Sequence, residues 1–433
     1  MKSGLPAWPE TDRDRARLTR FTFLTHLRPV SLHPNALRWQ ATFGLGGSSL
    51  VLLLLLVFSG TLQMAVYQPV PGEAHESVRA LETEVMFGSL VRGIHYWSAN
   101  LLVIVALLHA ARTFLTGGYV GKRGVTWVLG VVLMLLIVAA CFTGYLLPWD
   151  QLAYWAITIV TGMFDYLPGV GPALKRAALG GAEISDATLG NFFTLHTAAV
   201  PVALAMLAAW HFWRVRRAGG VVRQAGDEDA KVMFWPDLLV REVAQGLAVV
   251  AVVVVLAATL GAPLGEAANP GMSPNPAQAP WYFAGLQELL IHFHPVLAVL
   301  VLPLAGLILW LALPWLVRGP VPEGVWFLSP AGRWGAAVGA ITGALLAVIL
   351  VLASERVTTG GMVWLIRGLV PMAVLAVALI GVWFATLRRP EATRADALQA
   401  VVVLIVVAFV ILTLVGAVFR GEGMALDWPG GGS

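Results

Sequence analysis

The sequence predicts an all-α transmembrane protein with about nine membrane-spanning helices, and its composition and long apolar runs lead to this fold class. Apolar residues make up 58% of the 433 residues, only 12% are charged, and the mean hydropathy is +0.79. A soluble domain is about 25% charged, so a soluble chain of this composition would have too little polar surface to cover itself. The lipid bilayer must therefore be part of the solvent.

Nine apolar runs are long enough to cross the hydrocarbon layer, which takes about 20 residues. They cover residues 41–66, 93–116, 125–147, 191–215, 242–262, 295–317, 334–353, 363–388 and 396–419. The first forty residues are polar and rich in arginine, unlike a signal peptide. We divide the chain into an N-terminal segment (1–40), a four-helix bundle (41–225), a second helical region (226–390) and an additional span with its tail (391–433).

A large group of basic residues in the connections falls on one side if every run crosses the membrane once. They are Arg13, Arg15, Arg17, Arg20, Arg28, Arg38, Lys122, Arg123, Arg214, Arg216, Arg217, Arg223, Lys231, Arg318, Arg333, Arg388, Arg389 and Arg394. The positive-inside rule assigns this n side to the cytoplasm, so we expect a plasma (inner) membrane protein with a cytoplasmic N-terminus. The long connections 148–190 and 263–294 then lie on the opposite p side, and loops of this length usually carry function.

The single cysteine excludes several kinds of site. Cys141 lies inside an apolar run, so the chain has no disulfide framework, no CxxC metal site and no CxxCH attachment of c-type haem. We interpret it as a small buried hydrophobic residue. We explain the net charge of +4 by membrane topology, and expect no nucleic-acid partner.

Two apolar runs each contain two histidines at nearly the same spacing. His95 and His109 are 14 residues apart, and His196 and His211 are 15 apart. Fourteen helical residues span about 21 Å and return to within about 40° of their starting direction, and fifteen to within about 60°. Each helix therefore presents two imidazoles on one broad face, one near each membrane surface. Pro201 can kink the second helix and absorb the odd residue.

These two runs cross in the same direction, which pairs the histidines by depth. His95 faces His196 near the p side, and His109 faces His211 near the n side. Two neutral imidazoles across a gap suit axial ligation of haem iron. Zinc or copper is an alternative, but carboxylates or thiolates to complete such a site are missing nearby. Polar contact between helices is the other alternative, although histidine is costly in hydrocarbon.

Glycines and arginines support the haem interpretation. Gly46 and Gly60 in the first run, and Gly130 and Gly144 in the third, are each 14 residues apart, which would let two flat macrocycles lie against the backbone. Ordinary membrane helix packing is the alternative.

Arg92 and Arg112 each lie three residues from a histidine of the second run. They can pair with haem propionates, or alternatively only reach the membrane surface. We interpret the remaining histidines as surface residues, with the first two also able to border an n-side quinone pocket: His26, His33, His75, His292 and His294.

At these residues the chain resembles cytochrome b of the bc and b6f complexes. GYLLPWDQ, from Gly144 to Gln151, is similar to the GYxLPW motif of that family. The sequence from Trp155 to Gly171 and the segment HFWRVRR are closer to the b6f branch, and FWPDLL, from Phe234 to Leu239, resembles the start of its subunit IV. The resemblance covers most of the chain and implies that both pieces are fused here, with an added last span.

The chain departs from the family in two places. APWYF, from Ala279 to Phe283, stands where the family has PEWY, so Pro280 replaces a glutamate expected to accept a proton. Glu288 is the first candidate to replace it, with Asp150, Tyr145 or water as others, although Glu288 has an alternative role as a solvated or capping carboxylate. The b6f branch attaches an extra haem to an n-side cysteine, whereas Cys141 lies within a span, so we expect no covalent haem.

The resemblance implies the cytochrome b subunit of a quinol:cytochrome c (or similar) oxidoreductase with two non-covalent bis-histidine b haems. One electron of quinol would reduce a Rieske iron–sulfur protein, and the other would cross both haems and reduce quinone near Arg214 and Asp237 on the n side, with proton translocation. A loop cap is the alternative for Asp237. Quinol would bind near Tyr145, Trp149, Trp281 and Tyr282. An interfacial aromatic belt is the alternative for the group Trp149, Tyr154, Trp155, Trp281 and Tyr282.

The expected partners are a Rieske protein, a c-type cytochrome or another electron acceptor, quinol (with menaquinol among the options), membrane lipid and a second copy in a homodimer. Two other functions stay open. A di-haem membrane anchor of another oxidoreductase usually has fewer spans and lacks the LPW and PWY pair. A transporter with intramembrane histidines would show no visible absorption.

Overall fold

The computed structural model describes residues 11, 13–14, 31–220, 231–317, 319, 321–356 and 362–427. Nine helices within these residues are long and apolar enough to cross a membrane, which confirms the predicted fold class. They are α4 (Leu45–Gln63), α6 (Gly88–Leu115), α7 (Gly124–Tyr145), α10 (Asp186–Thr194) continued by η4 (Leu195–Ala199) and α11 (Val200–Arg217), α12 (Leu239–Leu260), α14 (Leu302–Leu316), α15 (Pro330–Arg356), α16 (Val370–Leu387) and α17 (Arg394–Val418).

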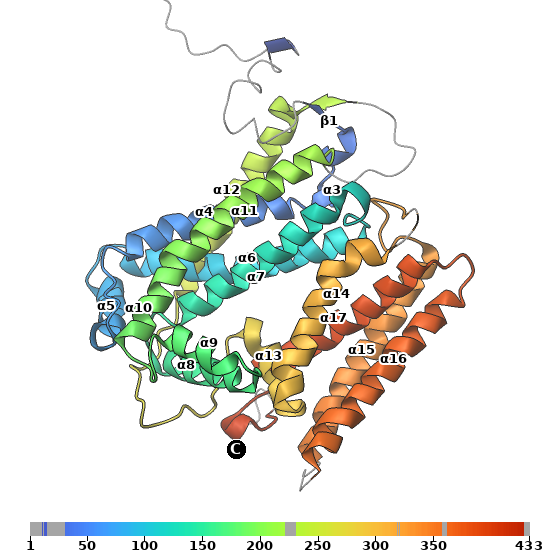
Figure 1. Ribbon diagram of the computed structural model, residues 1–433. Coiled ribbons are helices and arrows are strands. Elements are labelled where there is room, and N and C mark those ends of the chain that lie inside the picture. The colour runs from blue at the N-terminus through green and yellow to red at the C-terminus, as the bar shows by residue number, and fades with distance from the viewer. Residues whose placement is uncertain are drawn as a thin grey trace, which may run out of the picture.

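The spans form two groups (Figure 1). The first contains α4, α6, α7 and α10–η4–α11, and α12 packs onto it through α6 and α4. The second contains α14 to α17. Between the groups, the indole of Trp127 on α7 stacks on that of Trp310 on α14 with ring centres 5.2 Å apart, and its Nε1 donates to the Trp310 carbonyl at 2.6 Å.

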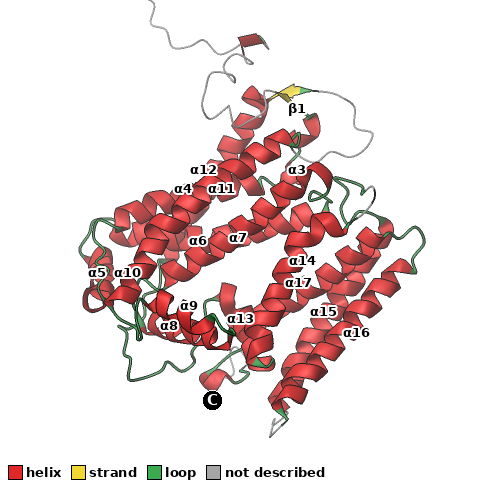
Figure 2. Ribbon diagram, in the orientation of Figure 1, coloured by secondary structure: helices red, strands yellow, loops and turns green. Residues whose placement is uncertain are grey.

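The short elements gather at the two ends of the bundle (Figures 1 and 2). At one end, β1 (Ser31–Leu32) pairs antiparallel with β2 (Val232–Met233), close to α3 (Trp39–Thr42); we call this the β1 end. The opposite α13 end carries α5 (Pro71–Thr83), α8 (Gln151–Met163), α9 (Gly171–Leu179), α13 (Trp281–His292) and η8 (Glu422–Met424). Both long connections, which we expect to carry function, lie at the α13 end.

The last span lies in the core of the second group. A methyl carbon placed at Gly339 of α15 would lie 2.2 Å from the carbonyl oxygen of Ala400, and one at Gly343 would lie 2.3 Å from that of Leu404, both on α17. Small residues in membrane helices allow this close approach of two backbones. Ala400 and Leu404 are fully buried as a result, so α17 is an integral part of this group.

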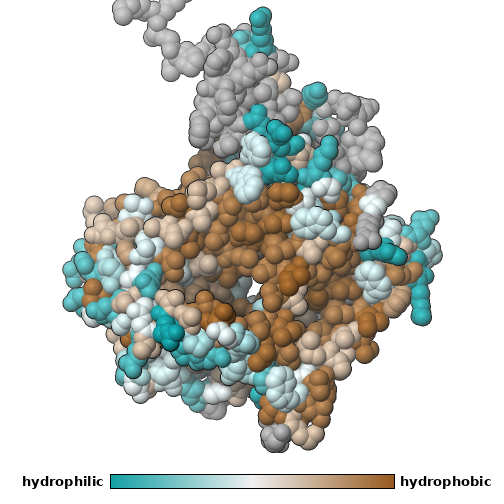
Figure 3. All heavy atoms as spheres, in the orientation of Figure 1, coloured by the Kyte–Doolittle hydropathy of each residue, from teal (hydrophilic) through white to brown (hydrophobic). Residues whose placement is uncertain are grey.

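The outer surface carries a broad apolar band, as Figure 3 shows on one face, and this face is hollowed near its centre. Large apolar side chains such as Leu247, Leu345 and Val377 are exposed on the outer surface of the molecule. Such a surface is unfavourable in water and suits contact with lipid. Polar side chains are concentrated toward the margins of this face.

Candidate functional site

The structure brings together the two predicted histidine pairs inside the first helix group. The ring centres of His95 and His196 are 6.1 Å apart, and those of His109 and His211 are 6.5 Å apart. A metal–imidazole bond is about 2 Å long and the ring centre lies about 1 Å behind the ligating nitrogen, so two imidazoles on opposite sides of one metal ion have centres about 6 Å apart. Both pairs therefore have the separation that two axial ligands of one iron need.

A π-helical turn brings the second helix into register. His196 lies in this turn, η4, and Pro201 follows within the first turn of α11. A π-helical turn contains more residues than an α-helical one, so it absorbs about one residue without changing the direction of the helix. The 15-residue spacing between His196 and His211 thereby matches the 14-residue spacing on α6. From the sequence we expected a kink at Pro201 to absorb the odd residue, whereas the π-helical turn lies just before it, at Leu195–Ala199.

Hydrogen bonds at Nδ1 orient both rings of the pair nearest the α13 end. His196 Nδ1 lies 3.1 Å from the carbonyl oxygen of Ala140, and His95 Nδ1 lies 3.0 Å from Oγ of Ser59, whose hydroxyl donates to the Leu55 carbonyl at 2.6 Å. An imidazole that donates from Nδ1 carries its free lone pair on Nε2, where a metal ligand needs it. These contacts therefore suit iron ligation through both Nε2 atoms.

Each of the four predicted glycines faces one of the four histidines. A methyl carbon in place of the glycine hydrogen would meet the ring atom Cε1 at 3.6, 3.0, 3.4 and 2.4 Å for the pairs Gly46–His109, Gly60–His95, Gly130–His211 and Gly144–His196, respectively. A side chain at these places would occupy the space beside the ligand rings. The glycines thus leave room there for a flat group held by the histidines.

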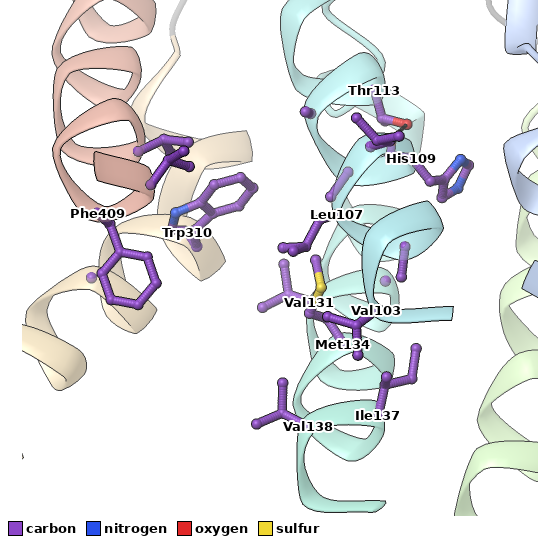
Figure 4. A pocket seen from close by; sticks show the side chains of 18 of the residues that line it. Val103, Leu107, His109, Thr113, Val131, Met134, Ile137, Val138, Trp310 and Phe409 are labelled. Carbon is purple, nitrogen blue, oxygen red and sulfur yellow. Dashed lines mark hydrogen bonds between the residues drawn. The ribbon is translucent and has the colours of Figure 1, made fainter. Parts of the chain in front are cut away.

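A cavity of about 1910 Å³ lies between the two helix groups and includes the histidine pair nearest the β1 end. Trp310 and Phe409 form one wall, and Leu107, Val131 and Val138 lie across from them (Figure 4). The cavity is large and apolar enough to admit a hydrophobic ligand such as a quinone.

Two arginines near this histidine pair have buried donors available. Among the described residues, Nε of Arg112 and Nε of Arg214 are buried without a hydrogen-bond partner. Arg112 also lines the cavity beside His109. A buried guanidinium donor without an acceptor is costly, and a carboxylate is its best partner. Arg112 therefore fits the predicted haem carboxylates and Arg214 an anionic or polar ligand group. The haem role of Arg112 and the quinone role of Arg214 both remain predictions.

Arg92 and Asp237 have other surroundings. The Arg92 guanidinium forms an ion pair with Glu82 and donates to the carbonyls of Ala262 and Pro263 at 2.9 and 2.6 Å. These contacts fasten α6 to α5 and to the connection after α12. Asp237 is exposed and does not line the cavity. The propionate role of Arg92 and the quinone role of Asp237 stay predictions without a supporting contact.

The two family-like motifs meet at the α13 end. Phe142 of α7 and Phe283 of α13 contact each other edge to face with ring centres 5.9 Å apart. Trp281 donates from Nε1 to Asn100 of α6 at 2.7 Å. Burial raises the pKa of Tyr282, and the nearby Cys141 and Tyr145 raise it further. The three aromatic residues Trp281, Tyr282 and Phe283 of α13 also line the large apolar cavity.

Pro280 and Asp150 shape this region through the backbone. Pro280 is the N-cap of α13, and its carbonyl accepts hydrogen bonds from Phe283 and Ala284. The Asp150 carboxylate caps α8 through the Ala153 N–H at 2.9 Å and accepts from the Gly265 N–H at 3.2 Å. Asp150 therefore fastens the two long connections together. Trp149 is buried beside it.

The expectation that His292 is a surface residue is wrong. His292 is 1% exposed and Glu288 is 0% exposed, so Glu288 is not a solvated carboxylate either. They form a cluster with Arg420, which sequence reasoning missed because nothing in the local sequence after α17 points to a partner on α13. His75 and His294 are half-buried, and His294 stacks on Trp364 with ring centres 3.6 Å apart. His26 lies outside the described residues.

Comparison with known proteins agrees with this geometry. The family model Cytochrome b/b6/petB matches residues 31–219. Cytochrome b6 of Synechococcus sp. (strain JA-3-3Ab) is 44% identical over 175 residues, which cover 40% of this chain and 81% of the relative. Cytochrome b6 of Oltmannsiellopsis viridis is 43% identical with the same coverage.

A solved structure shares the fold over nearly the full length. It is titled "Hyperthermophilic respiratory Complex III" and matches with a TM-score of 0.64 at 22% identity, covering 87% of this chain and 91% of that chain. The histidine bundle, the family model and the cytochrome b6 relatives agree. The chain belongs to the cytochrome b/b6 family and is a multi-pass membrane cytochrome that holds b-type haem without a covalent bond.

Proposed function

We propose that the chain is the cytochrome b subunit of a quinol:cytochrome c (or similar) oxidoreductase that oxidises quinol at the α13 end and reduces quinone at the β1 end. The observation that carries this proposal is the presence of two histidine pairs, with ring centres 6.1 and 6.5 Å apart, at two depths of one bundle. Residues 95 and 109 are separated by about 21 Å along α6, so the two pairs together span most of the hydrocarbon layer.

The chain's own side chains hold the cofactors. His95 and His196 would hold one b haem, and His109 and His211 the other, with the Nδ1 contacts and the four glycines fixing ring orientation and space. Arg112 would supply positive charge to the carboxylates of the haem nearest the β1 end. When bound, two b haems supply one-electron transfer across the membrane.

Aromatic residues of two motifs would bind the quinol. Trp281 and Tyr282 line the large cavity, Tyr145 lies near Tyr282, and the hydrogen bond from Trp281 to Asn100 holds the indole in place. An apolar wall excludes water and favours a neutral quinol ring. Bifurcation sends one electron to a Rieske protein and one across the membrane. Pro280 has neither a carboxylate nor an N–H, so the quinol proton leaves through another group.

The charge distribution orients the complex. Basic residues of the β1 end, among them Arg214 and Arg216, support a cytoplasmic location of that end under the positive-inside rule, and the α13 end would then face the opposite compartment. In this orientation quinol oxidation releases protons on one side and quinone reduction takes them up on the other. The further partners are a c-type cytochrome or a similar acceptor, and a second copy of the chain in a homodimer.

A purified complex tests this function. We expect a reduced-minus-oxidised spectrum with two low-spin b-type components, a co-purifying Rieske protein, and quinol oxidation that is blocked by an inhibitor of the p-side site. Haem signals with inhibitor-insensitive electron transfer and no iron–sulfur partner would instead identify a di-haem anchor. A colourless protein would contradict both and leave the transporter.

A further inference from the structure

A buried cluster of charged side chains lies at the α13 end, outside the histidine pairs and the aromatic site. Glu288 and His292 of α13 are 0% and 1% exposed, and Arg420, just after α17, is 6% exposed. Ser354 and Glu355, near the end of α15, complete the cluster. Burying such groups costs free energy unless they are paired and hydrogen-bonded, and here each of them is.

Arg420 connects the two carboxylates. It donates from Nη2 and Nε to the two oxygens of Glu288 at 2.7 and 2.8 Å, and from Nη1 to Glu355 at 2.6 Å. Burial raises the pKa of Glu288, but hydrogen bonds from Arg420 and His292 outweigh this and hold that pKa below its usual value. Glu288 is therefore a weak base that stays ionised. The adjacent His292 is the better candidate to accept a proton.

The neighbour, His292, has hydrogen-bond partners in both of its protonation states. Its Nε2 lies 2.9 Å from Glu288, its Nδ1 lies 2.6 Å from Oγ of Ser354, and that Oγ lies 2.9 Å from the Val351 carbonyl. In the neutral state, Ser354 donates to Nδ1. In the protonated state, Nδ1 donates to Oγ, and the hydroxyl turns to the Val351 carbonyl. Rotation of one hydroxyl thus accommodates the arrival of a proton.

Charged side chains from several elements face His292 and Ser354. The carboxylate of Glu288 and the guanidinium of Arg420 contact the imidazole, and Glu355 accepts from the same guanidinium. Arg367 lines both cavities together with Ser354.

The cluster lies where two cavities approach each other. Ser354 lines the large cavity that also contains Trp281 and Tyr282, and it lines a second pocket of about 440 Å³. Glu355 lines only the second pocket, and its side chain is 34% exposed. Ser354, the hydrogen-bond partner of His292, therefore borders the interior cavity as well as the pocket that leads to the surface.

We propose that His292 holds the proton released in quinol oxidation, receives it through Ser354 from the large cavity, and releases it past Glu355 to the surface. Glu288 and Arg420 are positioning residues. This inference rests on the proposed function. Quinol loses two hydroxyl protons and two electrons; the electrons go to an iron–sulfur protein and the cytochrome's own redox centres. Both O–H bonds break. One proton forms an N–H bond at Nδ1 of His292, which breaks again when that proton leaves, and the other proton passes to water on the same side.

The test uses the intact complex with three variants: His292→Gln, Ser354→Ala and the control Ser329→Ala. Ser329 donates to Asp396 at 2.8 Å, so the control removes a partly buried hydrogen bond, like that of Ser354, at the opposite end of the same α15–α17 pair. The measurements are inhibitor-sensitive quinol oxidation across pH and the haem spectrum. We expect both His292→Gln and Ser354→Ala to slow turnover about 10- to 100-fold and to flatten its rise with pH, with normal spectra, while Ser329→Ala stays at the wild-type rate.

Ser354→Ala keeps every ion pair of the cluster. This variant therefore tests the relay even if His292→Gln fails to fold. Wild-type rates and pH profiles in both cluster variants would overturn the relay and leave the proposed function standing. An equal loss in Ser329→Ala and Ser354→Ala would also overturn it, because helix packing then explains the effect. A wild-type complex without inhibitor-sensitive quinol oxidation would overturn the proposed function itself.

Discussion

Gly144 and His196 lie so close together that a methyl carbon on the glycine would be 2.4 Å from the imidazole Cε1. This is the tightest of the four glycine–histidine approaches and joins α7 to η4. Non-bonded carbon atoms approach no closer than about 3.5 Å without repulsion, so any larger residue must displace the ring. Only glycine at position 144 therefore leaves room for the His196 ring in its observed position.

Gly144→Ala should impair the haem site nearest the α13 end. We expect loss or strong reduction of one low-spin component in the redox difference spectrum, with the other retained. Gly190→Ala is the matched control, because a methyl group at Gly190 meets no atom within 4 Å among the described residues. A full spectrum in Gly144→Ala would show that the ring can shift without losing its ligand role.

Replacement of single histidines should separate the two haem sites. His95→Ala should remove the component held with His196, and His211→Ala the one held with His109, because one axial ligand alone does not keep a low-spin bis-histidine iron. Quantitative haem extraction and low-temperature spectra measure this. His75→Ala should retain both components, because the His75 ring lies 2.8 Å from the Gly265 carbonyl and beside Glu76, and belongs to neither histidine pair. If His95→Ala retains both low-spin components, the assignment of His95 as a haem ligand is wrong.

The contact between α15 and α17 should tolerate no added methyl group. Gly339→Ala places a carbon 2.2 Å from the Ala400 carbonyl oxygen, and overpacking of this kind costs about 1–3 kcal/mol. We expect a lower thermal midpoint in detergent, followed by tryptophan fluorescence. Gly381→Ala on α16, where a methyl group meets no described atom within 4 Å, should unfold at the wild-type temperature.

Arg420→Gln should destabilise the second helix group and reverse part of its pH dependence. Removing the guanidinium leaves Glu288 buried and poorly paired, at a cost of about 3–5 kcal/mol. In the wild type the pKa of Glu288 is lowered from 4.5, so its stabilising contribution is present above pH 4.5 and is lost as the pH falls through the lower, folded-state value. In the variant, burial raises this pKa, and stability should instead increase on mild acidification.

Thermal unfolding is measured between pH 4 and 8, roughly the range in which a carboxyl pKa raised by burial lies. This measurement distinguishes the pH dependence of the variant from that of the wild type. The double variant Glu288→Gln/Arg420→Gln removes both charges and should recover much of the lost stability. A single Arg420→Gln variant as stable as the wild type at every pH would contradict the buried ion pair.

The sequence was most informative where the membrane itself imposes the rule. Hydrocarbon thickness sets the length of a span, and all nine predicted runs correspond to nine helices of the described chain. Helical periodicity and the direction of each span likewise paired His95 with His196 across 101 positions. These features depend on local pattern and on a uniform solvent, which a single sequence displays directly.

The sequence was least informative where the contact is specific and distant. Glu288 and Arg420 are 132 positions apart, and their ion pair depends on how α17 packs against α15 and α13. His292 was expected at the surface because it lies within the connection 263–294, yet packing of α17 against α13 buries it. Small residues such as Gly339 control that packing, and a glycine in a membrane helix has too many ordinary uses to reveal which neighbour it serves.

The packing of α12 against the first helix group explains how such a chain could be encoded by one gene or by two. Although α12 follows the four-helix bundle in sequence, it contacts α6 and α4, and β2 just before it pairs with β1. Two polypeptides divided ahead of β2 would keep all these contacts and lose only the high effective concentration that a covalent link provides. One gene can therefore become two, or two can fuse, without a new interface having to evolve.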